Sequence, residues 1–366
     1  MNKKAILVLA DGSVYRGYSF GSEMDAWGEV VFNTSMTGYQ EMLTDPSYAG
    51  QIVVPTYPLI GNYGVNQEDA ESGRIQVRGF VVREECLEPN HYQKKKTVHE
   101  YLSDSGIPGM FGVDTRAITR KLRSHGVMMG YMTTEKTAEE ALKELERLPD
   151  YGSSDFVREV TCEERFEWPG VDGVPEFNVA VLDLGTKFNI LRLLTKRGCR
   201  VMTMPCTSSA QDILALDPDG IVLSPGPGDP RLLDYAVNTV ERLVGKKPIM
   251  GICLGNQLVA RAFGADIFKL KFGHRGGNHP VKEFATGRVH ITAQNHGYAV
   301  DPDKLKDGLE VSHVNLNDGT VEGLRHKELP IFCIQYHSEA SPGPLDNTYL
   351  FDRFVEMMES ERPSSR

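Results

Sequence analysis

The C-terminal half of the chain alternates short apolar runs with longer amphipathic segments. The apolar runs predict β-strands, and the segments with apolar residues at every third or fourth position predict helices. The predicted strands are 177–182, 200–204, 220–223 and 248–252, and the helices that follow them are 187–197, 210–216, 232–243 and 256–263. Short strands alternating with helices are typical of parallel βαβ units. We therefore expect an α/β fold with a doubly wound, mostly parallel sheet.

The rest of the chain has a different pattern. Beyond Gly264 the pattern predicts strands at 288–292, 309–314 and 331–335 and a helix at 346–361. The first part predicts strands at 5–9, 30–33, 52–56 and 79–82, with helices at 115–124, after Asp114 as N-cap, and at 137–148. Residues 151–176 are rich in Gly, Pro and acidic residues. We therefore expect a β-rich α/β domain at 1–150, a linker at 151–176 and the parallel-sheet domain at 177–366.

Composition and charge exclude several classes of protein. Of the 366 residues, 40% are hydrophobic, and no apolar run approaches the roughly 18 residues of a membrane span. The basic start and the short apolar run after it favour a first strand over a signal peptide. Net charge is −10, which disfavours binding to nucleic acid. The six cysteines form no CxxC pair, as in a reduced, cytoplasmic protein.

A candidate nucleophile lies where the strand at 248–252 gives way to a helix. Gly251-Ile252-Cys253-Leu254-Gly255 has the Gly-x-nucleophile-x-Gly pattern of a sharp turn that presents its central side chain at the carboxyl edge of a sheet. The helix N-terminus and a nearby imidazole would favour the thiolate. The alternative is a buried cysteine that only packs, which is our interpretation of the other five.

His337 is the best candidate for the base, because it follows the strand at 331–335 and is two residues from Glu339 on the same face. Alone, the pair would more often be a strand-end histidine beside a solvated carboxylate. The segment 224–230, Ser-Pro-Gly-Pro-Gly-Asp-Pro, either contributes backbone N–H groups to an oxyanion hole, together with that of Leu254, or is only a stiff turn. We interpret 271–279 as a shaped loop, because its histidines lack metal-ligand spacing, and expect no metal site.

Three of these segments resemble the signatures of class I (triad-type) glutamine amidotransferases: 224–230, 251–257 (Gly-Ile-Cys-Leu-Gly-Asn-Gln) and 337–343 (His-Ser-Glu-Ala-Ser-Pro-Gly). The N-terminal segment 28–48 and the segments 271–281 and 291–297 are similar to one family in particular, the small, glutamine-hydrolysing subunits of carbamoyl-phosphate synthetase. The resemblance covers nearly the whole chain.

The resemblance implies the roles of individual residues. Cys253 would be the nucleophile, His337 the general acid and base, and Glu339 the carboxylate that orients it. The glutamine pocket would comprise Ser47, Gly226, Gly228, Leu254, Gln257, Asn295, Gly297 and Tyr298. Because Ser47 belongs to the first domain, the two domains would pack against each other at the site. The chain departs from the usual pattern at Asn256, often His, at Ser338, often Pro, and at Tyr298, often Phe.

The implied activity is hydrolysis of L-glutamine to glutamate and ammonia through a γ-glutamyl thioester on Cys253. A large synthetase subunit would receive the ammonia and make carbamoyl phosphate from bicarbonate and ATP, for arginine or pyrimidine biosynthesis. ATP and a divalent metal would bind to that partner, and this chain, which has no GxxxxGK[ST] motif, would need no cofactor. The alternatives are another cysteine amidohydrolase, similar to γ-glutamyl hydrolase, and a non-catalytic regulatory subunit.

Overall fold

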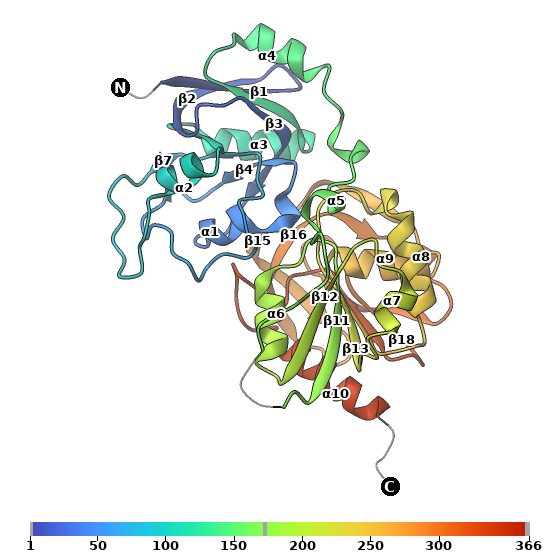
Figure 1. Cartoon of the computed structure of the whole chain (residues 1–366). Coiled ribbons are helices and arrows are strands. Elements are labelled where there is room, and N and C mark those ends of the chain that lie inside the picture. Colours follow the sequence, from blue (N-terminus) through green and yellow to red (C-terminus); the bar gives the residue numbers. More distant parts are fainter. Residues whose placement is uncertain (1–2, 171–173, 363–366) are drawn as a thin grey trace. The chain divides into compact units, whose positions relative to one another are not determined.

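The computed structural model describes residues 3–170 and 174–362, which form two compact units (Figure 1). The first unit ends at Phe156 and the second begins at Val157. The division lies within the segment 151–176 that the sequence analysis assigns to a linker. That segment contains a 3-10 turn (η2, Tyr151–Ser153), a short helix (α5, Val157–Val160) and a short strand (β10, Phe166–Glu167).

The first unit is built on a closed barrel of seven strands in the order β1-β2-β8-β6-β4-β3-β9. Its strands are β1 (Lys4–Leu9), β2 (Val14–Gly21), β3 (Ala26–Asn33), β4 (Gln51–Pro55), β6 (Gly79–Val81), β8 (Pro108–Phe111) and β9 (Met128–Thr133). A small sheet of β5 (Leu59–Ile60) and β7 (Glu84–Glu85) and the helices α1 (Tyr39–Thr44), α2 (Val98–Asp104), α3 (Thr115–His125) and α4 (Ala138–Leu145) complete it. The expected β-rich domain is confirmed, including Asp114 as the N-cap of α3.

The second unit contains a ten-stranded sheet in the order β10-β12-β11-β13-β14-β19-β18-β17-β15-β16. The strands β12 (Cys199–Pro205), β11 (Phe177–Asp183), β13 (Gly220–Leu223), β14 (Ile249–Ile252) and β19 (Ile331–Ile334) are parallel neighbours. One face packs against α6 (Phe188–Thr195) and α10 (Tyr349–Glu361), and the other against α7 (Ala210–Leu214), α8 (Asp234–Leu243) and α9 (Leu254–Ala262). The doubly wound fold is confirmed. No helix in the described residues has the length and apolar composition to span a membrane.

The strands that follow β19 in the order of this sheet are antiparallel to their neighbours. They are β18 (Val321–His326), β17 (Leu309–Asn315), β15 (Ile267–Glu283) and β16 (Val289–Val300). Our interpretation of 271–279 as a loop was therefore wrong, because these residues belong to β15. The pairing with β16 shifts register between Lys269 and His274 and again between Gly276 and His279. Such irregularities interrupt the alternation of apolar and polar residues from which a strand is predicted.

The topology brings three separate segments to one edge of the sheet. The strands β13, β14 and β19 are adjacent and parallel, so their carboxyl ends meet. The loop 224–230 follows β13, Cys253 follows β14, and the segment with His337 and Glu339 follows β19. Ligands bind at this edge in open α/β sheets.

Candidate active site

Cys253 occupies a strained turn between β14 and α9. Its φ and ψ angles are 51° and −102°, which non-glycine residues rarely adopt. A Cβ atom at Gly251 would lie 2.9 Å from Cys333 Sγ, and one at Gly255 would lie 2.2 Å from the carbonyl oxygen of Leu223. Both glycines are therefore required by close packing. The turn holds Cys253 at the N-terminus of α9, where the helix dipole favours an anion.

His337 and Glu339 form a buried pair next to this turn. His337 Nδ1 lies 2.6 Å from Glu339 Oε1, and the His337 backbone N–H donates to the carbonyl of Ala293 at 2.9 Å. Burial alone would lower the pKa of His337, but the Glu339 charge and the Cys253 sulfur outweigh it and raise the pKa to about 10. His337 Nε2 makes no hydrogen bond of good geometry with any described residue, so this nitrogen remains available to exchange a proton with a substrate.

A third charged group, Lys187, extends the His337–Glu339 pair. Lys187 is 1% exposed, and its Nζ lies 3.1 Å from Glu339 Oε1 and also donates to the carbonyl of Ala340. Burial would raise the pKa of Glu339, but Lys187 and then His337 lower it to about 2. The carboxylate is thus ionised between two cationic groups. Lys187 was not among the predicted site residues. The signal in the sequence was a lysine just beyond the carboxyl end of the predicted strand at 177–182.

The predicted pocket residues of the second unit lie on three elements. Gly226 and Gly228 are in the loop after β13, Leu254 and Gln257 are in the first turn of α9, and Asn295, Gly297 and Tyr298 are in β16.

Two contacts connect these elements near the nucleophile. The Cys253 thiol donates to the carbonyl of Asn295 at 3.8 Å, and Gln257 Nε2 donates to the carbonyl of Tyr298 at 3.0 Å. The Leu254 N–H is the first of α9 and has no acceptor within that helix, so it suits an oxyanion.

Tight packing determines the shape of the loop after β13. A Cβ atom at Gly226 would lie 2.1 Å from the carbonyl oxygen of Leu184, and Gly228 has a φ of 90°.

Ser47 belongs to the first unit, where its N–H donates to Asp45 Oδ1 at 2.9 Å. Its hydroxyl has no hydrogen-bond partner among the described residues. Its place in the glutamine pocket stays a prediction.

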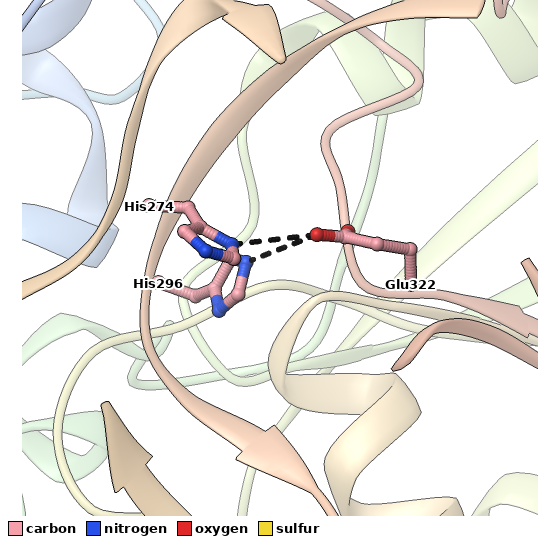
Figure 2. A group of neighbouring side chains, drawn as sticks. All are labelled: His274, His296 and Glu322. Atoms are coloured by element: carbon pink, nitrogen blue, oxygen red, sulfur yellow. Dashed lines mark ion pairs between the residues drawn. The ribbon is translucent and has the colours of Figure 1, made fainter. Parts of the chain in front are cut away.

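Figure 2 shows the buried side chains of His274, His296 and Glu322. Their ring nitrogens and carboxylate oxygen lie close enough together to hold a metal ion. Glu322 Oε1 lies 3.4 Å from His274 Nδ1 and 4.0 Å from His296 Nε2. However, both carboxylate oxygens of Glu322 already accept amide N–H donors, from Asn315 at 2.8 Å and from Gln294 at 2.9 Å.

His274 also has its own partners. Its Nε2 lies 2.7 Å from Asp318 Oδ2. Burial opposes its charge, but Asp318 and Glu322 raise its pKa to about 9, so a metal ion would have to displace a proton from this ring. We therefore interpret the group as a protonated His274 paired with Asp318 and Glu322, beside a His296 whose pKa burial holds well below its usual range.

The comparisons with known proteins agree with this geometry. A family model described as "Glutamine amidotransferase class-I" matches residues 180–357, which include Cys253, His337 and Glu339. The fold and the site thus define a class I glutamine amidotransferase. A second model, "Carbamoyl-phosphate synthase small chain, CPSase domain", matches residues 7–132.

Curated relatives match over the whole length of the chain. A protein of Syntrophotalea carbinolica is 50% identical and covers 99% of both chains, and one of Aquifex aeolicus is 50% identical and covers 98% of this chain and 99% of its own. A protein of Nostoc sp. is 51% identical, and the match covers 99% of this chain and 97% of the Nostoc protein. Each is named carbamoyl phosphate synthase small chain. The chain belongs to the carbamoyl phosphate synthase small-chain family.

Proposed function

We propose that this chain hydrolyses L-glutamine to glutamate and ammonia as the small subunit of a carbamoyl-phosphate synthetase. The observation that carries the proposal is the arrangement of Cys253 at a strained turn beside the buried His337–Glu339 pair. Membership of the small-chain family supports it, and so does the match of a class I amidotransferase model to the unit that holds these residues.

In the first half of the reaction, the Cys253 thiolate attacks the side-chain amide carbon of glutamine and a C–S bond forms. The carbonyl oxygen becomes an oxyanion, which the N–H groups of Leu254 and Gly228 would stabilise. The His337 imidazolium gives its Nε2 proton to the amide nitrogen. The C–N bond then breaks, ammonia leaves and a γ-glutamyl thioester remains. The raised pKa of His337 favours this starting state, since the ring begins protonated.

In the second half, His337 Nε2, now neutral, takes a proton from a water molecule. The resulting hydroxide attacks the thioester carbon, the C–S bond breaks, and glutamate and the Cys253 thiolate are released. Glu339 holds the ring through Nδ1 in both halves and stabilises its charged form. Lys187 keeps Glu339 ionised, so that the carboxylate does not take the proton.

The ammonia has to reach a second active site before water protonates it. We therefore propose a large synthetase subunit as the partner in a hetero-oligomer, with bicarbonate, ATP and the divalent metal bound there and no cofactor in this chain. We also propose a cytoplasmic location, for which the six free cysteines, all in the described part of the chain, give support. Co-purification of a large ATP-binding chain from native extract tests the partner. A chain that is always isolated alone contradicts it.

Glutamate release by the purified protein tests the activity. Wild type and Cys253→Ser are compared with L-glutamine and with larger γ-glutamyl amides as substrates. We expect release from glutamine by the wild type only. Equal rates for the two proteins would refute a catalytic role of Cys253. Preference for the larger amides would indicate a different amidohydrolase.

A further inference from the structure

Gln335 is a fully buried residue directly after β19 and two residues before His337, and its side chain contacts the nucleophile. Its backbone N–H donates to the carbonyl of Glu322 at 2.9 Å, which fixes the main chain. Its side-chain Nε2 lies 3.6 Å from Cys253 Sγ, within the range of an N–H···S hydrogen bond. The mechanism described above does not use this contact.

The orientation of this carboxamide follows from its neighbours. Gln257 Nε2 donates to the backbone carbonyl of Tyr298 at 3.0 Å, and because a carbonyl can only accept, the amide of Gln257 cannot be reversed. The same NH₂ group donates to Gln335 Oε1 at 3.1 Å, as does Asn256 Nδ2 at 3.1 Å. The oxygen of Gln335 is therefore turned toward two donors, and its NH₂ group is turned toward the sulfur.

The sulfur of Cys253 thus lies between an acceptor and a donor. The carbonyl of Asn295 can accept the S–H of the thiol, at 3.8 Å, but it offers nothing to a thiolate. The Gln335 N–H can donate to the negative sulfur, and a hydrogen bond to the charged form of a group favours that form. All of these atoms are buried, so water does not replace the missing donor if Gln335 is changed.

We propose that Gln335 is a further catalytic residue, whose carboxamide N–H stabilises the Cys253 thiolate in the resting enzyme. Asn256 and Gln257 act as positioning residues, because their amide groups hold the Gln335 oxygen away from the sulfur. This inference rests on the proposed function for its catalytic meaning, but the contact itself can be measured without glutamine.

The test is the pH dependence of the alkylation of Cys253 by iodoacetamide, with the modified residue identified by peptide mapping. Burial raises the pKa of the neighbouring Cys333 thiol to about 12, which slows its reaction near neutral pH, and peptide mapping distinguishes it from Cys253. Gln335→Met removes the donor while keeping the length of the side chain. We expect the midpoint of Cys253 alkylation to rise by about one pH unit.

Two further variants separate the effect from disturbed packing. Gln40→Met deletes another buried carboxamide, one that lies in the first unit and contacts Asn66, and we expect it to leave the midpoint unchanged. Gln335→Glu keeps the shape but removes the N–H donor, and should raise the midpoint at least as far as Gln335→Met, which covers the case that the Met variant does not fold.

Glutamate release provides the second readout. For Gln335→Met we expect kcat/KM at pH 7 to fall by up to about fivefold, which is the largest loss of thiolate that a rise of one pH unit causes when the wild-type midpoint lies at or below 7. The loss should be recovered at pH values above the new midpoint, because more thiolate then forms. A loss from misfolding would not recover with pH. An alkylation midpoint equal to the wild-type value in a folded Gln335 variant would overturn the proposal. If the midpoint shifts but the wild type releases no glutamate, the proposed function fails and the assignment of the N–H···S contact stands.

Discussion

Replacing Glu339 by Gln tests how the buried charges of the site depend on one another. The substitution keeps the shape of the side chain and one acceptor oxygen, but removes the negative charge. Lys187 Nζ, 3.1 Å from Glu339 Oε1, would then be a buried cation that has lost this carboxylate partner. His337 would lose the carboxylate 2.6 Å from its Nδ1.

The magnitude follows from burial. The side chains of Lys187 and Glu339 are 2% and 0% exposed. Removing one partner of such a pair typically costs about 3–5 kcal/mol, because the remaining charge has no compensation. The carbonyl of Ala340 still accepts from Lys187, so we expect the lower value, about 3 kcal/mol. With an m-value of about 2 kcal/mol per molar urea, the unfolding midpoint should fall by about 1.5 M.

The assay is urea unfolding followed by tryptophan fluorescence. The chain has two tryptophans, Trp27 in the first unit and Trp168 in the second, where it packs against the core. In a Trp27→Phe background the signal reports on the second unit alone. The double variant Lys187→Met with Glu339→Gln removes both charges, and should regain most of the lost stability.

Activity should respond differently from stability. Both the single and the double variant lack the carboxylate that orients His337 and stabilises its charged form, so we expect each to lose on the order of 10²-fold in kcat/KM. Equal urea midpoints for the single and double variants would contradict this prediction, because they would show that Lys187 does not depend on Glu339 for its charge balance.

Three other predictions follow from single contacts. The pKa of His274 is raised from 6.5 to about 9, so its contribution to stability is complete below pH 6.5 and is lost as the pH rises through 9. Over this pH range the free energy of unfolding of the wild type should fall by about 3 kcal/mol, and that of His274→Gln by much less. Urea unfolding measures both. Gly226→Ala places a Cβ atom 2.1 Å from a backbone oxygen, so the loop must move and the rate of glutamate release should fall at least about tenfold. Gly170→Ala is the control, because a Cβ atom there meets no atom within 4 Å. Ser338→Ala removes a buried hydroxyl that has no partner among the described residues and should raise stability by about 1 kcal/mol; an unchanged or lower midpoint would contradict this.

The sequence predicted the parts of the molecule whose pattern is local. The helix at Thr115–His125 has its N-cap, its apolar face and a glycine after its end within one short segment, so its bounds were predicted closely. The turn around Cys253 was predicted for the same reason, since both glycines and the nucleophile are adjacent in sequence.

The parts that were missed depend on residues distant in sequence. Lys187 precedes a helix, where a lysine is usually solvated, and its buried partner Glu339 follows β19, a strand distant in sequence. Residues 271–279 have no strand alternation because bulges interrupt their pairing with β16. Gln335 was assigned to a strand without a role, since its contact with Cys253 appears only when β14 and β19 are side by side.

The proposed mechanism depends most on the covalent intermediate at Cys253, which acid quenching can trap. The protein is mixed with isotopically labelled L-glutamine, quenched in acid during turnover, digested and mapped by mass spectrometry. We predict label on the peptide that contains Cys253, lost on treatment with hydroxylamine and absent from Cys253→Ser. Turnover of glutamine with no label on that peptide, or with label on another cysteine such as Cys333, would contradict the proposed mechanism.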